Sequence, residues 1–288
     1  MSDKELDSVT GTETTGHEWD GIKELNTPLP RWWLWTFYGT IVFAIGYTIA
    51  FPAWPMISSA TTGVLGYSSR ADLAADVAAA SAAQGDMVAQ VAATPVADIL
   101  GNDDLARFAS AGGKSLFKVF CSQCHGTGAT GSVGYPNLND DEWIWGGTPD
   151  QIYTTIAHGA RSDSDADTHF NLMPNFGTDQ LLEPAQIDLV ANQVASLSGI
   201  EGGVPSPEGA QLFADNCASC HGETGNGMPD LGGPSLTDQI WLYEGSLEAI
   251  KTQINRPRHG VMPAWSARLG DTAVKELAIY VHGLGGGQ

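Results

Sequence analysis

Basic residues are scarce in this sequence. It has 13 Lys and Arg against 33 Asp and Glu, and its formal net charge is -20. This composition argues against a nucleic-acid partner, because binding to a phosphate backbone needs clustered Lys and Arg. A cationic partner fits better. Aromatic residues and glycine are plentiful, with nine Trp and 35 Gly, so a folded protein is expected rather than a disordered acidic chain.

Charge is absent altogether between Arg31 and Arg70. Within this stretch, residues 32–54 form an apolar run, and about 20 such residues are enough to cross a bilayer as a helix. Trp residues stand at both ends, as is typical of membrane interfaces. A cleaved signal peptide and a buried soluble helix are the alternatives. A signal peptide has a shorter leader and an apolar core of about 7 to 15 residues, so we predict a retained anchor.

The charges that flank the apolar run predict its orientation. Lys4, Lys23 and Arg31 precede it, whereas Arg70 alone follows it closely. The positive-inside rule therefore places the N-terminus in the cytoplasm and the rest of the chain outside. The predicted segments are a cytoplasmic segment 1–31, a transmembrane helix 32–54 and an outer, Ala-rich connector 55–107.

From Gly112 onward the chain repeats itself, which predicts two copies of one small domain at 108–200 and 201–288. The matching pairs are Gly113 and Gly209, Phe117 and Phe213, Leu138 and Leu236, Trp143 and Trp241, and His158-Gly159 and His259-Gly260. Strand signals are absent, and helical patterns are expected into each Cys motif and at 150–157, 183–197, 247–254 and 272–283. The first copy carries an insertion, 161–172, whose polar and acidic composition is typical of a surface loop.

All four cysteines lie in two copies of C-x-x-C-H, at 121–125 and 217–221. This pattern is that of covalent c-type haem attachment. Two thiols one helical turn apart can both reach the vinyl groups on one porphyrin edge, and the next residue then lies beneath the iron. A zinc site or a redox-active dithiol would not require the following His. We therefore predict two covalently bound haem c groups. The tethers are Cys121, Cys124, Cys217 and Cys220, with His125 and His221 as proximal iron ligands.

The sixth iron ligand determines the chemistry, because Met opposite His closes the site and raises the reduction potential, as suits electron transfer. Met173 and Met262 are the candidates: each precedes Pro, and they lie 48 and 41 residues after their histidines at equivalent places in the repeat. Met228 follows His221 by only seven residues, which is too few to reach the far haem face. The rival ligands are His158, His259 and, more weakly, His169; each could instead bind a propionate or the backbone.

The sequence does not decide which Met serves which haem; the simple expectation pairs Met173 with the first haem and Met262 with the second. Other residues have weaker assignments. Trp143, Trp145 and Trp241 are expected to pack against haem faces or propionates. Arg161, Arg256 and Arg258 could pair with propionates or be ordinary surface charges. The acidic residues 140–142 and the inserted loop could steer a basic electron donor or simply be solvated.

Taken together, the chain resembles the membrane-anchored dihaem cytochrome c subunit of cbb3-type cytochrome c oxidases, subunit III. The resemblance covers nearly the whole chain and is most specific at residues 20–55, where DGIKELNTPLPRWW leads into one aromatic-rich span. It implies an all-α fold, with one N-terminal transmembrane helix followed by two tandem class I cytochrome c domains. In some members of this family each Met ligates the haem of the other domain.

The resemblance implies an electron-transfer subunit without substrate chemistry of its own. Electrons from a soluble or membrane-bound cytochrome c would pass through two haems to the monohaem subunit, and then to the haem b and copper centre of the large subunit, where oxygen is reduced and protons are pumped. The protein would be a single-pass protein of the bacterial inner membrane, with periplasmic haem domains. A free membrane-tethered dihaem carrier and a dihaem peroxidase are the alternatives. The peroxidase requires an open or displaceable sixth position, against which two equivalent Met-Pro pairs argue.

Overall fold

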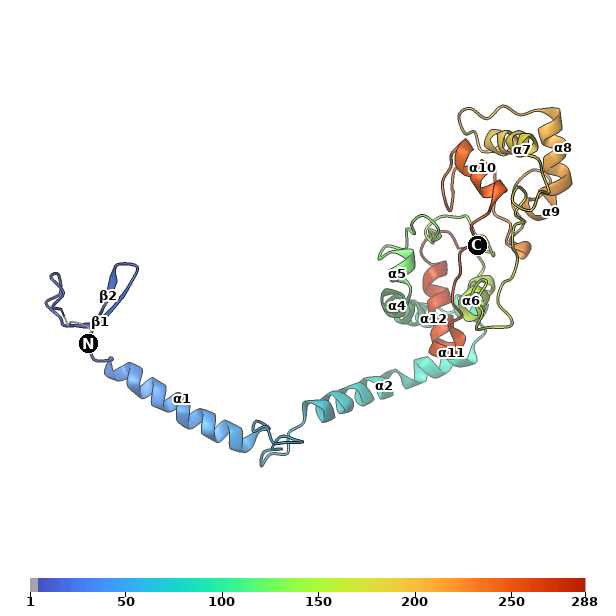
Figure 1. Ribbon diagram of the computed structural model, residues 1–288. Coiled ribbons are helices and arrows are strands. Elements are labelled where there is room, and N and C mark those ends of the chain that lie inside the picture. The colour runs from blue at the N-terminus through green and yellow to red at the C-terminus, as the bar shows by residue number, and fades with distance from the viewer. Residues whose placement is uncertain (1–4, 288) are drawn as a thin grey trace. The chain divides into compact units, whose positions relative to one another are not determined.

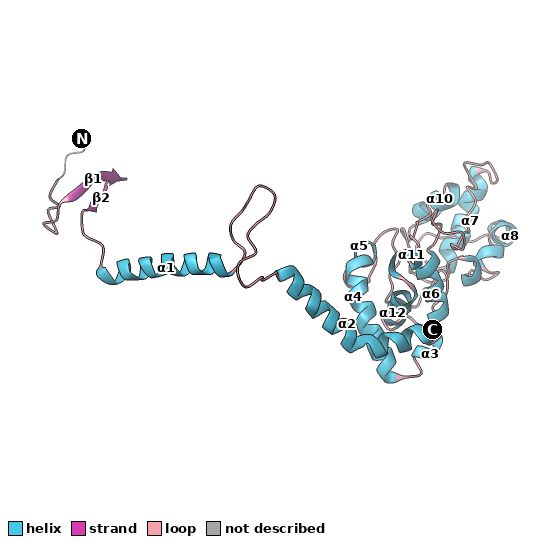
Figure 2. Cartoon of the chain, turned by 90° about the horizontal axis from the view of Figure 1, so that it is seen from below, coloured by secondary structure: helices cyan, strands magenta, loops and turns pink. Residues whose placement is uncertain are grey.

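The computed structural model describes residues 5–287 and divides the chain into two units, Met1–Ala83 and Gln84–Gln288. Helices make up nearly all of its regular structure (Figure 2). This confirms the predicted mainly helical class.

The first unit contains an antiparallel hairpin that the sequence analysis did not predict. Its strands are β1 (Thr14–Trp19) and β2 (Ile22–Leu25), and they are joined at Asp20 and Gly21, which both have positive φ. Asp-Gly is a preferred dipeptide for a two-residue hairpin turn. The signal was therefore present, but the flanking residues lack a clear apolar alternation.

Helix α1 (Arg31–Ala50) follows the hairpin and is the one helix of the described chain that is long and apolar enough to cross a membrane. None of its residues is buried. It ends four residues before the predicted end of the span, because Phe51 precedes Pro52 and adopts an extended conformation. A residue before Pro is disfavoured in the α-helical region.

The predicted Ala-rich connector contains helix α2 (Ser69–Ala93), which runs across the boundary between the two units. Most of the helix is exposed, and Val91 near its end is its one buried residue. That residue contributes to a core of the second unit. The connector is therefore mainly helical, and its last turns belong to the folded region.

Over its described residues, 84–287, the second unit contains ten further α-helices and one short 3-10 helix, most of which are labelled in Figure 1. These elements are α3 (Val96–Ile99), α4 (Asp103–Phe120), α5 (Ser122–His125), α6 (Pro149–His158), α7 (Pro184–Leu197), α8 (Pro207–Asn216), α9 (Ala218–His221), η1 (Pro229–Leu231), α10 (Leu247–Asn255), α11 (Ser266–Leu269) and α12 (Asp271–His282). The helices expected at 150–157, 183–197, 247–254 and 272–283 are all present, within one residue of their predicted bounds.

Local capping explains where the longer helices begin. The side chain of Asn102 accepts hydrogen bonds from two backbone N–H groups in the first turn of α4. At α6, Thr148 and Gln151 form a reciprocal capping box. Ser206 caps α8, and Pro207 stands at its first position. These contacts satisfy N–H groups that the helix itself leaves free, so each start is encoded in a few neighbouring residues.

The first core of the second unit combines segments that are far apart in the sequence. Helix α12 packs against α4 and α6, and Leu277 of α12 and Phe117 of α4 are almost fully buried in the same cluster. Tyr153 on α6 also donates a hydrogen bond to Asp271 at the start of α12, with an O–O distance of 2.6 Å. The final helix of the second sequence repeat thus completes the core around the first Cys motif.

The second core shows the reciprocal arrangement. Helix α7, which ends the first sequence repeat, packs against α8 and α10 of the second repeat. Val190 of α7, Phe213 of α8 and Ile250 of α10 are buried together. Each core therefore takes its last helix from the other repeat, an arrangement that we call the helix exchange.

Two equivalent glycines permit the close helix crossings in these cores. A Cβ atom at Gly113 of α4 would stand 2.0 Å from the backbone oxygen of Glu276 in α12. A Cβ atom at Gly209 of α8 would stand 2.7 Å from the backbone oxygen of Leu189 in α7. The repeated glycine thus has a packing reason, since any side chain would keep the helices apart.

Candidate haem sites

Both Cys motifs fold in the same way. In the first, α4 ends at Cys121, and the short helix α5 carries Cys124 and His125; the N–H of His125 donates to the carbonyl of Cys121 at 3.0 Å. In the second, α8, Cys217 and α9 repeat this arrangement around His221. The four thiols are free of disulfides. The two cysteines and the histidine of each motif therefore lie on a single tight turn, as covalent haem attachment requires.

Backbone carbonyls fix the tautomer of both motif histidines. Nδ1 of His125 lies 3.0 Å from the carbonyl oxygen of Pro136, and Nδ1 of His221 lies 2.9 Å from that of Pro234. Because a carbonyl oxygen only accepts, the proton must be on Nδ1. Burial also lowers the pKa of both imidazoles, more than their carbonyl contacts raise it. Each ring is thus neutral, with the Nε2 lone pair available to a metal. A metal-binding His usually donates its other ring N–H to a carbonyl or carboxylate in this way, which fixes the orientation of the ring.

A cavity of about 230 Å³, which we call the second cavity, lies against the second motif. His221 and Met173 both line it. Much of the remaining wall is apolar and comes from helices on both sides of the helix exchange, including Val190, Phe213 and Ile254. Burial raises the pKa of the Cys217 thiol to about 11. The cavity therefore offers an apolar pocket between a histidine and a thioether.

The polar groups of this cavity fit the carboxylate edge of a haem. Trp241 Nε1 is buried and has no hydrogen-bond partner among the described residues, and Trp241 lines the cavity. Arg161 and Arg258 line it as well. An unpaired buried N–H costs free energy, so an acceptor on a bound group would satisfy Trp241. Apolar walls, two thiols, a histidine, an unpaired N–H donor and two guanidinium groups together suit a covalently bound haem.

The methionines are placed differently from the simple expectation. Met173 of the first repeat packs against the second core and lines the cavity with His221, whereas Met262 of the second repeat packs against the first core, as Cys121 does. Each methionine thus lies beside the Cys motif of the other repeat, in contrast to the simple expectation that pairs Met173 with the first motif and Met262 with the second. The reason is the helix exchange, which takes each Met-Pro segment across together with the helix that follows it.

Two connections cross where the repeats exchange their helices. The N–H of Ala160 donates to the carbonyl of Met262 at 3.0 Å, and the N–H of Met262 donates back at 2.9 Å. One connection leads from α6 toward α7, and the other returns from α10 toward α12. His259 Nε2 accepts a hydrogen bond from the N–H of Met173 at 3.1 Å. The crossing thus orients the Met173 segment at the second cavity.

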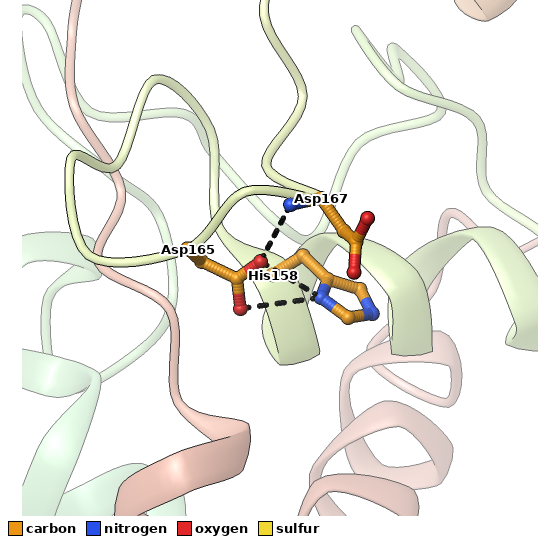
Figure 3. Close-up of side chains that lie close together, drawn as sticks. All are labelled: His158, Asp165 and Asp167. Carbon is orange, nitrogen blue, oxygen red and sulfur yellow. Dashed lines mark hydrogen bonds and ion pairs between the residues drawn. The ribbon is translucent and has the colours of Figure 1, made fainter.

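The other candidate ligands have protein partners. Nδ1 of His158 lies 3.2 Å from both carboxylate oxygens of Asp165, and Asp167 flanks the same ring (Figure 3). His169 stacks on Trp145 with ring centroids 4.3 Å apart, and its Nε2 lies 3.1 Å from the hydroxyl of Thr155. These contacts anchor the inserted loop to α6.

The inserted loop 161–172 is less peripheral than its composition suggests. Ser162 is buried, and Arg161 reaches the second cavity while its Nε donates to the carbonyl of Gly260 at 2.6 Å. From the sequence alone, only the polar composition of this loop was evident, and it indicated a surface loop. The loop is thus part of the crossing between the two cores, in addition to having exposed acidic residues.

Met228 and Trp143 lie apart from the second cavity lining. Met228 is partly exposed and pairs through its backbone with Gly233, in a turn that includes η1. Trp143 Nε1 donates to the carbonyl of Gly286 near the C-terminus. The indole N–H of Trp143 thus has a protein partner, whereas the indole N–H of Trp241, the equivalent residue of the second repeat, is unpaired among the described residues.

Known protein families match three segments of this chain. The family described as the N-terminal domain of cytochrome oxidase-cbb3, FixP, matches residues 11–58. The cytochrome c family matches residues 110–198, and the family described as cytochrome c oxidase, cbb3-type, subunit III, matches residues 205–281.

Similar proteins match along their whole length. A cbb3-type cytochrome c oxidase subunit FixP of Sinorhizobium medicae is 54% identical over 99% of this chain and 98% of its own. The subunit FixPc of Rhizobium leguminosarum bv. viciae is 54% identical over 100% of both chains. The subunit CcoP of Cereibacter sphaeroides is 49% identical over 96% of this chain and 95% of its own.

Proposed function

The chain belongs to the family of cbb3-type cytochrome c oxidase subunits named FixP or CcoP, and from this premise we propose that it is the subunit through which electrons enter such an oxidase. It carries two c-type haems, one on each Cys motif. When bound, each haem supplies a one-electron couple between Fe(III) and Fe(II). The observation that carries the proposal is the second cavity, where His221 and Met173 line one apolar pocket.

Each residue of the sites has a role in this function. Cys121, Cys124, Cys217 and Cys220 would tether the two haems, and His125 and His221, whose Nδ1 atoms are held by backbone carbonyls, would bind the irons through Nε2. The thioethers of Met173 and Met262 would also bind the irons, which would leave no place for a substrate on the metal. Apolar walls exclude water, and this limits the solvent reorganisation that accompanies a change of charge.

The helix exchange supports one assignment of the methionines. His221 pairs with Met173, and His125 pairs with Met262. The predicted domains 108–200 and 201–288 then describe the sequence repeats, while each haem is enclosed by residues of both. Arg161, Arg258 and Trp241 would hold the propionates of the second haem, and their place in the lining of the cavity supports this role.

The N-terminal segment anchors the protein in a membrane. Helix α1 is long and apolar enough to span it, and the family match at residues 11–58 includes this helix. The flanking charges support a cytoplasmic N-terminus and periplasmic haem sites in the bacterial inner membrane. The hairpin β1–β2 then faces the cytoplasm.

The partners follow from the place of this subunit in an oxidase. A donor cytochrome c delivers electrons to it; the monohaem subunit and then the large haem b and copper subunit receive them. Oxygen reduction and proton pumping belong to the large subunit, and this chain is not itself catalytic. The acidic net charge of -20 supports a basic donor.

Purification from native membranes in mild detergent tests the assignment. Haem b, copper and oxygen reduction that co-purify with the haem c of this chain would support the oxidase subunit. Two haem c groups per chain without haem b, copper or oxygen reduction would favour a free membrane-tethered carrier. Quantitative binding of carbon monoxide to the ferrous protein without loss of another ligand would point instead to a peroxidase.

A second experiment tests the methionine assignment. A variant with Cys121→Ala and Cys124→Ala retains the second haem alone. In this background Met173→Leu should abolish the methionine–iron absorption signal, whereas Met262→Leu should leave it. Loss of the signal with Met262→Leu instead would refute the crossed assignment.

A further inference from the structure

Another cavity, apart from the one against the second motif, lies between the two loops that follow the Cys motifs. Its volume is about 270 Å³, and its walls come from residues 130–144 on one side and 234–243 on the other. Pro136 and Pro234 both line it. Their carbonyls hold the imidazoles of His125 and His221, so this cavity adjoins the proximal side of both motifs.

Carboxyl groups from both loops meet at this cavity. Glu142 and Asp140 line it, and the carboxyl of Asp238 lies within hydrogen-bonding reach of Glu142. Oδ1 of Asp238 accepts a hydrogen bond from the N–H of Ile240 at 2.7 Å, whereas its Oδ2 is buried and has no partner among the described residues.

Two ionised carboxylates in this position would repel one another, and neither could donate a hydrogen bond. One proton held between Glu142 and Asp238 would remove one negative charge and turn the pair into a donor and an acceptor. The buried Oδ2 would then lie beside a donor. A carboxyl pair that shares a proton in this way loses its two protons in separate steps, with two apparent pKa values that belong to the pair.

The charges around the pair favour the proton. Burial and the neighbouring carboxylates of Asp238, Asp141 and Asp140 raise the pKa of Glu142 to about 7, with burial the largest cause. No Lys, Arg or His lines this cavity in the described chain. Its other titratable side chains are Tyr135 and Tyr243, and the guanidinium of Arg258 stacks on Tyr243, 4.2 Å from the ring centroid.

The pair is a feature of this interface and not of the repeat itself. Asp140 and Asp238 are equivalent in the two repeats, but Glu142 corresponds to Ile240. The first repeat therefore supplies the carboxyl of Glu142, for which the second repeat has no equivalent, and the two loops meet directly, since the N–H of Gly134 donates to the carbonyl of Leu242 at 2.7 Å.

We propose that Glu142 and Asp238 form a proton-binding site shared by the two haem loops, which takes up a proton from solvent when a haem is reduced and releases it on oxidation. This inference rests on the proposed function. The electron comes from a one-electron donor such as a reduced cytochrome c and converts Fe(III) to Fe(II). The added negative charge strengthens proton binding at the pair, and oxidation reverses both changes.

Redox titration of the full-length haem protein in detergent tests this site. The midpoint potential of each haem is measured from about pH 5 to about pH 9, a range that extends well above ordinary carboxyl pKa values. In the unchanged protein at least one potential should fall as the pH rises through neutrality. Glu142→Gln should remove this dependence, and Asp238→Asn should move it to lower pH because a nearby negative charge is lost.

Asp141→Asn is the matched control, since Asp141 is an exposed neighbour of Glu142 in the same loop. It should move the pH dependence without removing it. Infrared difference spectra between reduced and oxidised protein give an independent readout. A protonated-carboxyl band should grow on reduction and should be absent in Glu142→Gln.

An unchanged slope and an unchanged carboxyl band in Glu142→Gln would overturn the inference and assign the proton to another group, such as a haem propionate. Two haems per chain whose potentials do not change with pH would overturn it too, and would leave the proposed function intact. A chain without two haems would instead refute the proposed function.

Discussion

Replacing Gly113 by Ala tests which helix packs against α4. The added Cβ would stand 2.0 Å from the backbone oxygen of Glu276 in α12. A carbon atom needs about 3.3 Å from a carbonyl oxygen, so the helices would have to separate by roughly 1.3 Å. Backbone atoms cannot rotate aside, so we expect a cost of about 2–3 kcal/mol, the upper part of the range for overpacking. The exchange of a helical Gly for Ala returns up to about 1 kcal/mol, so we expect a net loss of about 1–2 kcal/mol.

Gly112→Ala is the matched control. A Cβ at Gly112 would meet the carboxylate of Glu276 at 2.5 Å, and this end of a flexible side chain can move. Both glycines lie in α4, so the gain in helix propensity is the same for both variants. We expect Gly112→Ala to be neutral or slightly stabilising.

Hydrogen exchange followed by mass spectrometry, on the full-length haem protein in detergent, measures the amide exchange rates of each helix separately. A loss of 1–2 kcal/mol corresponds to exchange about 5 to 30 times faster for amides that open with the first core. In Gly113→Ala this acceleration should occur in α4 and α12, while α7 and α8 keep their rates. Faster exchange in α7 with α12 unchanged would show that α4 packs within its own repeat, and would refute the helix exchange.

Four further variants test other contacts in the second unit. Leu277→Ala should destabilise the first core by about 2–5 kcal/mol and accelerate exchange in α4, whereas Ile187→Ala should accelerate exchange in α8 instead; the opposite pattern would contradict the two cores. Tyr153→Phe removes the hydrogen bond to Asp271 and should cost about 1 kcal/mol in thermal unfolding; an unchanged midpoint would show that this contact adds nothing. Glu142 has a folded-state pKa of about 7, above the ordinary 4.5, so the folded state binds more protons between these values and stability should fall as pH rises through this window. Glu142→Gln should flatten that part of the stability curve, and a curve that keeps its slope would exclude Glu142 as the source.

The sequence is sufficient where the determinants are local. The C-x-x-C-H turns need only five consecutive residues, and helix α6 begins where Thr148 and Gln151 form a capping box. The end of α1 is also local, although the prediction overlooked Pro52, which ends the helix before the apolar run ends. The hairpin was missed because its one clear signal, Asp20-Gly21, lies between strands without alternating apolar residues.

The sequence does not determine the packing where two equivalent helices could pack against the same helix face. Helices α7 and α12 are equivalent, and so are Gly113 and Gly209 on the helices that they cross. The pattern therefore predicts that such a crossing exists but not which copy supplies the partner. The positions of Met173 and Met262 depend on that choice.

The helix exchange also affects the order in which the protein is made. Gly113 and its contact at Glu276 are 163 residues apart in the chain, and contacts between distant residues form slowly because a long loop must close first. Synthesis produces the first Cys motif early, but the helix that completes its core is the last to be made. The motif made first is therefore enclosed last, and neither haem site can be produced as a separate half of this protein.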